Sequence, residues 1–403
     1  MTAVAERVPA EILVQIFEIR LKDRGYGHST HDLLRFSLVY RFWRAAIQGC
    51  PTLWSDIWLD VPTCRSMERQ AAYQLKRAGS TLLSLTIRFP YVYDVETPVA
   101  ALPARLANIF RDTMVRWKSF EMHAHPHAVQ SFLSRCAGST PNLSKLTITF
   151  KDLTRSFLPS LSIPFQRPVQ AESGPPVVAS IGHFLPRYAS LGAAITRLSV
   201  RVLTFRLHDF TTMLLSCPNL VQFDLAGSDS VRNGRMGDTS HPVIVPLLHL
   251  LDLRMSYIDE PAPLLESVEF ISFVDAPSLT ELSLLMHKIR PISSYDPTLV
   301  CDLIDRSCPP LRRLSLTWIG LADEDIIWCL QKLPLLEELV IIGGAMSDAT
   351  LRALAIPPPT EQGADQEVLL PRLRRANLWS PHTTEQGLKA LAACRNTVTW
   401  KHG

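Results

Sequence analysis

Residues 311–344, LRRLSLTWIGLADEDIIWCLQKLPLLEELVIIGG, contain two copies of one pattern. Each copy spaces its apolar residues as L-x-x-L-x-L, first at Leu311/Leu314/Leu316 and, 25 residues later, at Leu336/Leu339/Ile341. The alternation at the end of each copy is typical of a strand with one buried face, and the amphipathic segment 325–330 between them favours a short helix. A strand followed by a helix at a fixed period indicates a repeat architecture.

The pattern recurs along most of the chain. Successive copies begin mostly 25 to 37 residues apart, which is the range of leucine-rich repeats lengthened by insertions. Amphipathic helices are predicted between copies at 209–215, 299–306, 348–354 and 384–393. Further copies stand at Leu82/Leu85/Ile87, Trp117/Phe120/Met122, Leu143/Leu146/Ile148, Ile195/Leu198/Val200, Leu220/Phe223/Leu225, Leu248/Leu251/Leu253, Leu279/Leu282/Leu284 and Leu373/Ala376/Leu378, with a terminal strand at Val398/Trp400. We therefore expect an α/β solenoid of irregular leucine-rich repeats, with parallel strands on the concave face and helices on the convex face.

The composition argues against several classes of protein. The 41 Lys+Arg and 38 Asp+Glu give a net charge of +3 over 403 residues, which disfavours binding to nucleic acid by bulk charge. Proline or histidine interrupts the apolar stretches within about ten residues, so we expect no membrane span. The first residues do not resemble a secretory signal, and the 8 Cys include no C-x-x-C pair. Free thiols in the cytoplasm or nucleus are therefore expected.

The first sixty residues carry a different pattern. Residues 8–17 (VPAEILVQIF) place a proline and an acidic residue where they suit the first turn of a helix, and apolar pairs four residues apart then form one stripe. A second helical pattern covers residues 33–47 (LLRFSLVYRFWRAAI), and residues 51–57 (PTLWSDI) follow. So short a segment cannot enclose all of these large side chains, so some must face the next domain or another protein.

These three blocks, in this order, resemble the F-box, which begins L-P-x-E-[IL]-L, continues through S-x-V-C-x-x-W-R and ends in P-x-L-W. The sequence departs from this pattern at Val8, at Tyr40 and in a long loop over 22–31. The resemblance implies a three-helix F-box over residues 1–60 that binds a Skp adaptor and, through it, a cullin.

The resemblance also assigns adaptor-binding residues by their position in the motif. These are Pro9, Ile12, Leu13, Ile16, Leu38, Val39, Trp43 and Trp54. The alternative is that the same side chains pack among the three helices and against the following repeats, because part of a small helical stripe must face its own domain. Both interpretations stay open for each residue.

The rest of the chain divides by spacing and composition. Residues 61–81 are expected to form a linking helix and the lead-in to the first repeat, and residues 82–154 and 191–403 to form leucine-rich repeats. Between them, residues 155–190 are rich in proline, and the repeat spacing there is about twice the usual. Because proline interrupts both sheet ladders and helix interiors, we predict an inserted loop, either a partner-binding flap or a tolerated insertion.

Alternation in each strand sends some residues of every repeat to the face opposite the core. Arginine and tryptophan on a rigid face of this kind are the residue types that anchor protein interfaces. Candidates for binding a protein target are Arg197, Arg201, Asp224, Asp252, Arg254, Trp318 and Trp379. The alternative is a mixed, solvated sheet face, since single exposed apolar groups are ordinary.

Catalytic and metal-binding motifs are absent from the sequence. It contains no Gly-rich phosphate loop, no G-x-S-x-G and no H-E-x-x-H. His123, His125 and His127 are the best metal candidates, but no nearby Cys or carboxylate pair completes a coordination shell, which favours a solvent-exposed loop. The acidic run 323–325 is expected to cap a helix. We therefore expect no catalysis, no cofactor and no metal.

Together these observations favour a substrate receptor of a cullin-type (SCF) ubiquitin ligase, whose repeats bind a protein target that the sequence does not identify. The alternative is a non-ligase scaffold in which the F-box-like helices cap the end of the solenoid. A reader of nucleic acid or of a small molecule would draw on Arg197, Arg201, Arg206 and Arg254. Acidic residues on the same face oppose it.

Overall fold

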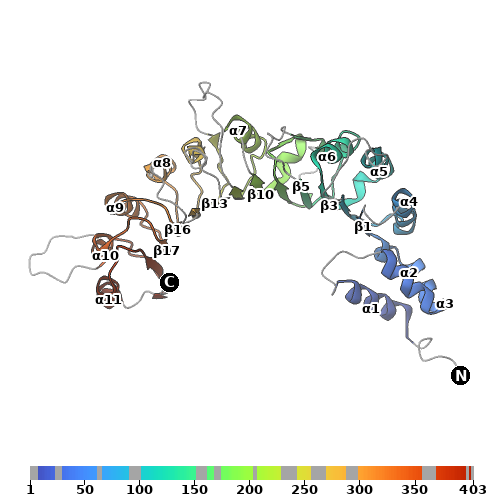
Figure 1. Ribbon diagram of the computed structural model, residues 1–403, viewed down its shortest axis with the longest axis horizontal. Coiled ribbons are helices and arrows are strands. Elements are labelled where there is room, and N and C mark those ends of the chain that lie inside the picture. The colour runs from blue at the N-terminus through green and yellow to red at the C-terminus, as the bar shows by residue number, and fades with distance from the viewer. Residues whose placement is uncertain are drawn as a thin grey trace, which may run out of the picture. The chain divides into compact units, whose positions relative to one another are not determined.

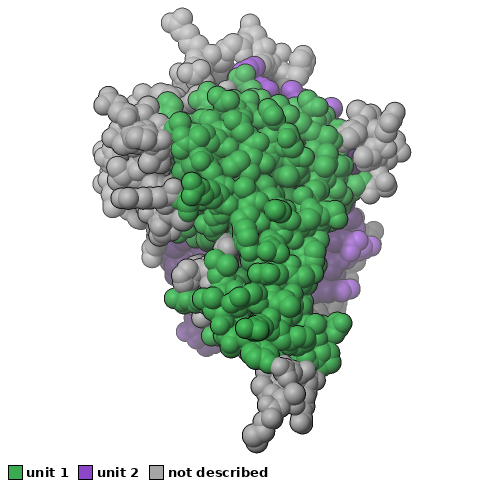
Figure 2. Space-filling model, turned by 90° about the vertical axis from the view of Figure 1, so that its right-hand side faces the viewer, with its two compact units in different colours: residues 1–195 green, residues 196–403 purple. Residues whose placement is uncertain are grey.

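Strands alternate with helices along the chain, as the repeat pattern predicts (Figure 1). The structure is a computed structural model that describes residues 8–22, 30–60, 66–89, 101–150, 161–167, 174–202, 207–227, 243–255, 269–286, 298–355, 369–395 and 399–400. The chain divides into unit 1, residues 1–195, and unit 2, residues 196–403, which Figure 2 distinguishes by colour. Within the described residues, no helix combines the length and the apolar character that crossing a membrane requires.

Unit 1 contains a parallel sheet with the strand order β1-β2-β3-β5-β8. At one position of the register, apolar residues of the five strands stand side by side and make the centre of the core: Ile57, Leu85, Phe120, Leu146 and Ala179. The strands are β1 (Asp56–Asp60), β2 (Leu83–Arg88), β3 (Trp117–Ala124), β5 (Lys145–Phe150) and β8 (Val177–Gly182). Two short strand pairs lie outside this sheet: β4 (Gly138–Ser139) with β7 (Phe165–Gln166), and β6 (Leu161–Ile163) with β9 (Pro186–Tyr188).

The helices of unit 1 form two groups. The first three precede the sheet, and the later ones cover one of its faces and leave the other without helices (Figure 1). They are α1 (Ala10–Lys22), α2 (Thr30–Val39), α3 (Arg41–Gly49), α4 (Met67–Ala78), α5 (Leu102–Arg111) and α6 (Pro126–Leu133), with 3-10 turns η2 (Pro51–Trp54), η5 (Met114–Arg116) and η6 (Ser190–Ala194). Phe120 stacks on Trp117 of its own strand at 5.1 Å and on Phe132 of α6 at 5.5 Å between ring centroids. These aromatic contacts hold α6 against the sheet.

Unit 2 repeats the same arrangement. Its parallel sheet runs in the order β10-β11-β13-β15-β16-β17-β18-β19 and carries a buried ladder of Phe223, Leu251, Leu282, Leu314, Leu339 and Ala376. The strands are β10 (Ile195–Val202), β11 (Gln222–Gly227), β13 (Leu250–Met255), β15 (Glu281–Met286), β16 (Arg313–Thr317), β17 (Glu338–Ile342), β18 (Arg375–Trp379) and β19 (Thr399–Trp400), and a separate pair joins β12 (Val243–Ile244) to β14 (Val274–Asp275). The helices are α7 (Leu207–Leu215), α8 (Thr298–Ser307), α9 (Asp323–Gln331), α10 (Asp348–Leu354) and α11 (Glu385–Cys394), with the 3-10 turn η7 (Glu269–Phe273).

The structure corrects the prediction of an inserted loop over residues 155–190. Within the described part of that range, β8 is a full strand of the main sheet, with Ile148 of β5 opposite Ile181. Its inward residues are Val177, Ala179 and Ile181 instead of leucines, so the repeat pattern did not reveal it. Pro175 and Pro176 lie just before this strand and interrupt no ladder of the main sheet.

A second correction concerns the end of the first sixty residues. Residues 56–60, assigned to the F-box, form β1, the strand that begins the sheet. Ile57 and Leu59 face the core, but five residues of alternation without the full leucine motif were too short to recognise. Helices α5 and α6 were also not predicted, whereas α4 agrees with the expected linking helix over 61–81.

Candidate protein-binding faces

Helices α1 and α2 each expose a stripe of large aliphatic side chains. On α1, Ile12, Ile16 and Ile19 are 44%, 50% and 60% exposed, and their spacing of four and three residues places them on one side of the helix. On α2, Leu34 and Leu38 lie one turn apart, and Leu38 is 73% exposed. Val39 and Pro9 are exposed as well. Five of the eight residues assigned to the adaptor, Pro9, Ile12, Ile16, Leu38 and Val39, are therefore accessible to a partner.

The other three assigned residues contribute to the core of the helical segment. Leu13 and Trp54 are buried, and the Trp54 indole N–H donates to the carbonyl of Ile47 at 2.8 Å. Trp43 is half-buried, and its ring meets that of Phe17 edge-on at 5.3 Å. Truncating Leu13 or Trp54 would therefore test folding before it tested any contact with a partner.

The helical segment also packs onto the first repeat. Trp54 of η2 meets the ring of Tyr73 on α4 edge-on at 5.5 Å, and η2 contacts both α4 and β1. Ile57 at the start of the sheet is buried beside them. One end of the segment thus covers apolar surface of the repeats, while its α1 and α2 stripes stay exposed.

The strand face of unit 1 centres on Glu121, a residue that no sequence motif marks. Its carboxylate accepts a hydrogen bond from His123 Nε2 at 2.7 Å and lies 3.8 Å from both Lys145 Nζ and Arg88 Nη2. The Arg88 guanidinium lies over the ring of Trp58, 4.2 Å from its centroid. The hydrogen bond from His123 and the positive charges around it lower the pKa of Glu121, although burial opposes this shift.

Five of the seven candidate target-binding residues lie on strands β10, β11 and β13. Arg197 and Arg201 are exposed on β10, and Asp224 of β11 stands directly opposite Asp252 of β13. Asp252 pairs with Arg254 at 2.6 Å. Burial raises the pKa of Asp224, and the neighbouring Asp252 adds to this, while a hydrogen bond from Gln222 opposes it. The structure thus brings the two acidic residues together with an arginine, as alternation predicts.

Strands β16, β17 and β18 carry two parallel Arg–Glu–Arg arrays at their amino-terminal ends. In the first, Glu338 lies between Arg313 (3.8 Å) and Arg375 (2.6 Å), all three at one position of the register. In the second, formed by the residue just before each strand, Glu337 lies between Arg312 (3.5 Å) and Arg374 (3.8 Å). We call these six residues the twin arrays. None of the six was among the candidate residues, although the repeat register already places Arg313, Glu338 and Arg375 in one row.

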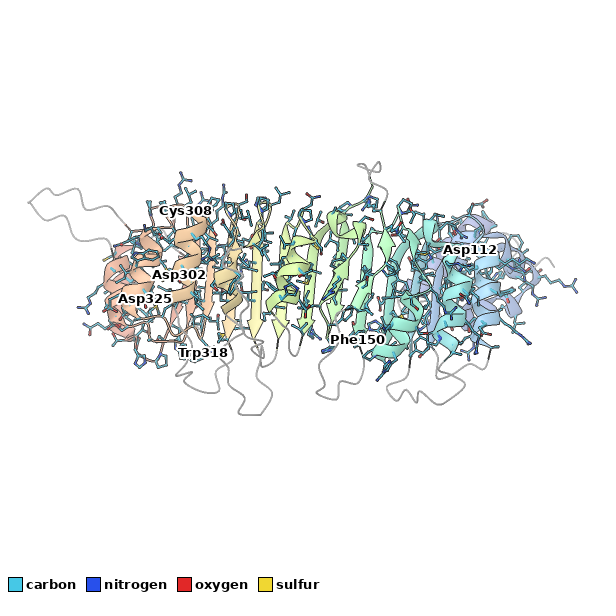
Figure 3. The ribbon with its side chains drawn as sticks, turned by 90° about the horizontal axis from the view of Figure 1, so that it is seen from above. Asp112, Phe150, Asp302, Cys308, Trp318 and Asp325 are labelled. Atoms are coloured by element: carbon cyan, nitrogen blue, oxygen red, sulfur yellow. The ribbon has the colours of Figure 1, made fainter. Side chains whose placement is uncertain are left out.

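The remaining two candidates, Trp318 and Trp379, form a pair at the carboxyl-terminal ends of the same strands. Their rings meet edge-on with centroids 5.8 Å apart, and both side chains are half-buried (Figure 3 labels Trp318). Trp318 has a φ of 60°, in the left-handed region that bulky residues avoid, and its N–H donates to the carbonyl of Ile342 at 2.6 Å. Its ring covers Gly343, where a Cβ would lie 2.3 Å from the indole. Only a glycine at this position leaves room for the Trp318 ring.

The histidines and cysteines show no metal site within the described residues. The prediction that the three histidines occupy one exposed loop is wrong, because they lie on two elements. His123 is in β3 and donates to Glu121, whereas His125 caps α6, its ring accepting from the backbone N–H of His127 at 3.4 Å. The described cysteines are free thiols.

No family model matches the sequence, and no curated protein matches it. Among solved structures, the chain is similar to one in the crystal structure of the Rad7 and Elc1 complex in yeast, with 15% identity over 97% of this chain and 92% of that chain and a TM-score of 0.41. At this identity and TM-score, the similarity establishes neither a shared family nor a shared function.

Proposed function

We propose that this protein is the substrate-recognition subunit of a cullin-type (SCF) ubiquitin ligase. The stripes on α1 and α2 would bind a Skp-type adaptor, and the strand face of the repeats would bind a protein target. The protein itself would catalyse nothing. Its contribution is to raise the effective concentration of the target beside the ubiquitin-conjugating enzyme. We further propose that it acts in the cytoplasm or nucleus.

One observation carries the proposal: the F-box-like segment has filled its own core and still exposes Ile12, Ile16, Ile19 and Leu38. Leu13, Phe17 and Ile47 fill that core. Burying one large aliphatic side chain contributes about 1.5–3 kcal/mol, so a surface of several such residues is suited to a stable protein interface. The position of Ile12, Ile16 and Leu38 within the F-box-like blocks indicates an adaptor as the partner.

The proposal is tested by charging the exposed stripes. Ile16→Asp with Leu38→Asp should abolish co-purification with the Skp adaptor, because each carboxylate would have to be desolvated in the interface. Both side chains are exposed, so the fold should survive, as circular dichroism can verify. Arg20→Gln, an exposed polar change on α1, is the matched control and should bind normally. Full adaptor binding by the doubly charged variant would refute the assignment.

A scaffold without ubiquitin output is the second candidate, favoured by the packing of Trp54 against Tyr73. In that case the helical segment serves to cap the apolar end of the repeats. Co-purification of the full chain from cells separates the two functions. A cullin in the bound set supports the ligase. Stable partners without a cullin, in material whose α1 and α2 stripes are unchanged, support the scaffold.

A further inference from the structure

We infer that strands β16, β17 and β18 bind an acidic segment of the target protein, a run of Asp and Glu residues followed by a large apolar side chain. The inference rests on the proposed function, in that it takes the strand face to be the target-binding face. It specifies which part of that face makes the contact and which chemistry the partner must have. Two groups of residues support the inference: the twin arrays and the pair formed by Trp318 and Trp379.

Charge is the first argument. In the twin arrays, four arginines accompany two glutamates, so positive charge is in excess by two. Glu281 on β15 lies 4.0 Å from Arg313, and the exposed Arg372 before β18 offsets it. The arginine side chains are 51% to 79% exposed, whereas that of Glu338 is only 15% exposed. A partner approaching this end of the strands therefore meets guanidinium groups first.

Preorganisation is the second argument. Each glutamate lies between two arginines on neighbouring strands and restrains both, which lowers the entropy that a ligand must remove on binding. A guanidinium has five N–H donors, so one carboxylate contact leaves donors for a second carboxylate from the partner. Arg313 and Arg375 stand two strands apart, at about 10 Å by the usual strand spacing. A segment with several acidic residues can engage both at once.

The tryptophan pair supplies the second anchor. Trp379 lies four residues after Arg375 on the same strand, at about 13 Å by the usual rise per residue. Gly343 and the left-handed backbone of Trp318 fix the orientation of the pair. Half-buried aromatic rings of fixed orientation are typical anchors for an apolar side chain. The partner should therefore carry an aromatic or aliphatic residue about four positions beyond its acidic run.

A nucleic acid fits this surface less well than a protein segment. In each array a glutamate stands between the two arginines, so no continuous row of positive charge is available to a phosphate backbone. Between the arginine end and the tryptophan end, the face carries Val340 beside the neutral Ser315 and Asn377, and no further positive charge. These features favour carboxylates on a peptide that also brings apolar groups.

The test uses the full chain and a fluorescein-labelled synthetic peptide that contains four alternating Asp and Glu residues, a Gly-Ser spacer and Leu-Phe-Leu. Fluorescence anisotropy should show saturable binding. Exchanging the acids for Asn and Gln, or the apolar residues for Ser, should weaken it at least about tenfold. Arg313→Gln with Arg375→Gln, and separately Trp379→Ala, should also weaken it about tenfold or more. Arg352→Gln, an exposed arginine on α10 and outside the strand face, is the control and should bind as before.

Several outcomes would overturn the inference. Equal binding of the Asn/Gln peptide, or unchanged affinity in the double arginine variant, would each do so. Tighter binding of single-stranded DNA, lost in the same variant, would assign the surface to polyanions. If the Gln variant does not fold, Arg313→Lys with Arg375→Lys keeps the charge but not the paired donors, and unchanged peptide binding by that variant would contradict recognition by fixed guanidinium groups.

The proposed function is separable from this inference. Suppose that the protein binds the adaptor, that Arg88→Glu on unit 1 abolishes ubiquitination of the target, and that the double arginine variant does not. This result would support the proposed function and refute the site on β16, β17 and β18.

Discussion

Asp323 joins two consecutive repeats through a single carboxylate. It is the first residue of α9, yet it accepts hydrogen bonds from the N–H (2.9 Å) and hydroxyl (2.6 Å) of Ser347 and from Thr350, at the start of α10. Asp348, the first residue of α10, does the same for Thr384 before α11. From the sequence alone, the acidic run 323–325 is expected to cap its own helix. The side chain instead serves the next helix, which only the packing of repeats reveals.

This arrangement makes the stability of unit 2 depend on pH. Burial alone would raise the pKa of Asp323, but the hydrogen bonds from Ser347 and Thr350 hold it below its ordinary value. The folded-state pKa is therefore below that of the unfolded chain, so the stabilisation is complete above about pH 4 and is lost as the pH falls through the folded-state pKa. Asp323→Ala should lower the free energy of unfolding by about 1–2 kcal/mol at pH 7.

Urea denaturation between pH 7 and pH 3 measures this effect, and the difference between the unchanged protein and the variant should shrink at the acidic end. Glu324→Ala, at the exposed neighbouring position, is the control. A difference that stayed constant over the whole pH range would show that the carboxylate charge is not involved.

At the scale of the elements, half-buried or buried arginines tie several repeats to the one before them. Arg116 Nε donates to the carbonyl of Thr81 at 2.9 Å, and Arg306 Nη2 donates to those of Ile271 (3.0 Å) and Val274 (2.8 Å). These carbonyls lie in or next to turns and 3-10 segments, where regular secondary structure leaves acceptors unpaired. A positive side chain with several donors is suited to satisfy them.

Arg395, after α11, is the most extensive case. It is 6% exposed and donates to the carbonyls of Leu354 (2.7 Å), Leu370 (3.0 Å) and Leu369. Arg395→Met would preserve much of the side-chain volume but remove a donor from all three carbonyls, of which only that of Leu370 keeps another, the N–H of Leu373. We therefore expect a loss of about 3 kcal/mol in the free energy of unfolding. Hydrogen exchange across α10 and α11, together with urea denaturation, measures it. Lys389→Met on the exposed side of α11 should change neither, and an equal loss there would contradict this role of Arg395.

Whether a strand or helix could be predicted from the sequence depends on its inward-facing residues. The strands with Leu314, Leu339 and Ile341 repeat the leucine pattern closely and were confirmed, whereas Val177 and Ala179 of β8 do not, and that strand was missed. The same limit applies to the sites. The F-box-like motif located α1 and α2 but did not separate the exposed Ile16 from the buried Leu13, because both fit one helical stripe and only the packing of α3 distinguishes them.

At the scale of the whole molecule, the net charge of +3 averages over local arrangements of opposite sign. On unit 1, positively charged groups surround Glu121. On unit 2, Asp224 and Asp252 place two negative charges side by side, whereas the twin arrays have an excess of positive charge. A uniform polyanion would be repelled by part of this face. A protein partner with its own charge pattern can match it, which is the reason for seeking the target among proteins.

The two proposed contacts belong to different units, and this makes a prediction about the full chain. Ile16→Asp with Leu38→Asp should abolish adaptor binding without changing affinity for the acidic peptide, and Arg313→Gln with Arg375→Gln should do the reverse. Substitutions at residues without shared partners have additive effects on binding free energy. The quadruple variant should therefore lose adaptor binding to the same extent as the α1 and α2 double variant, and peptide binding to the same extent as the double arginine variant. Ubiquitination of the target should fail in either parent, because recruitment requires both contacts at once. Measuring adaptor co-purification and peptide anisotropy on the same four proteins tests this, and a change of peptide affinity in the α1 and α2 variant would show that the two units are coupled.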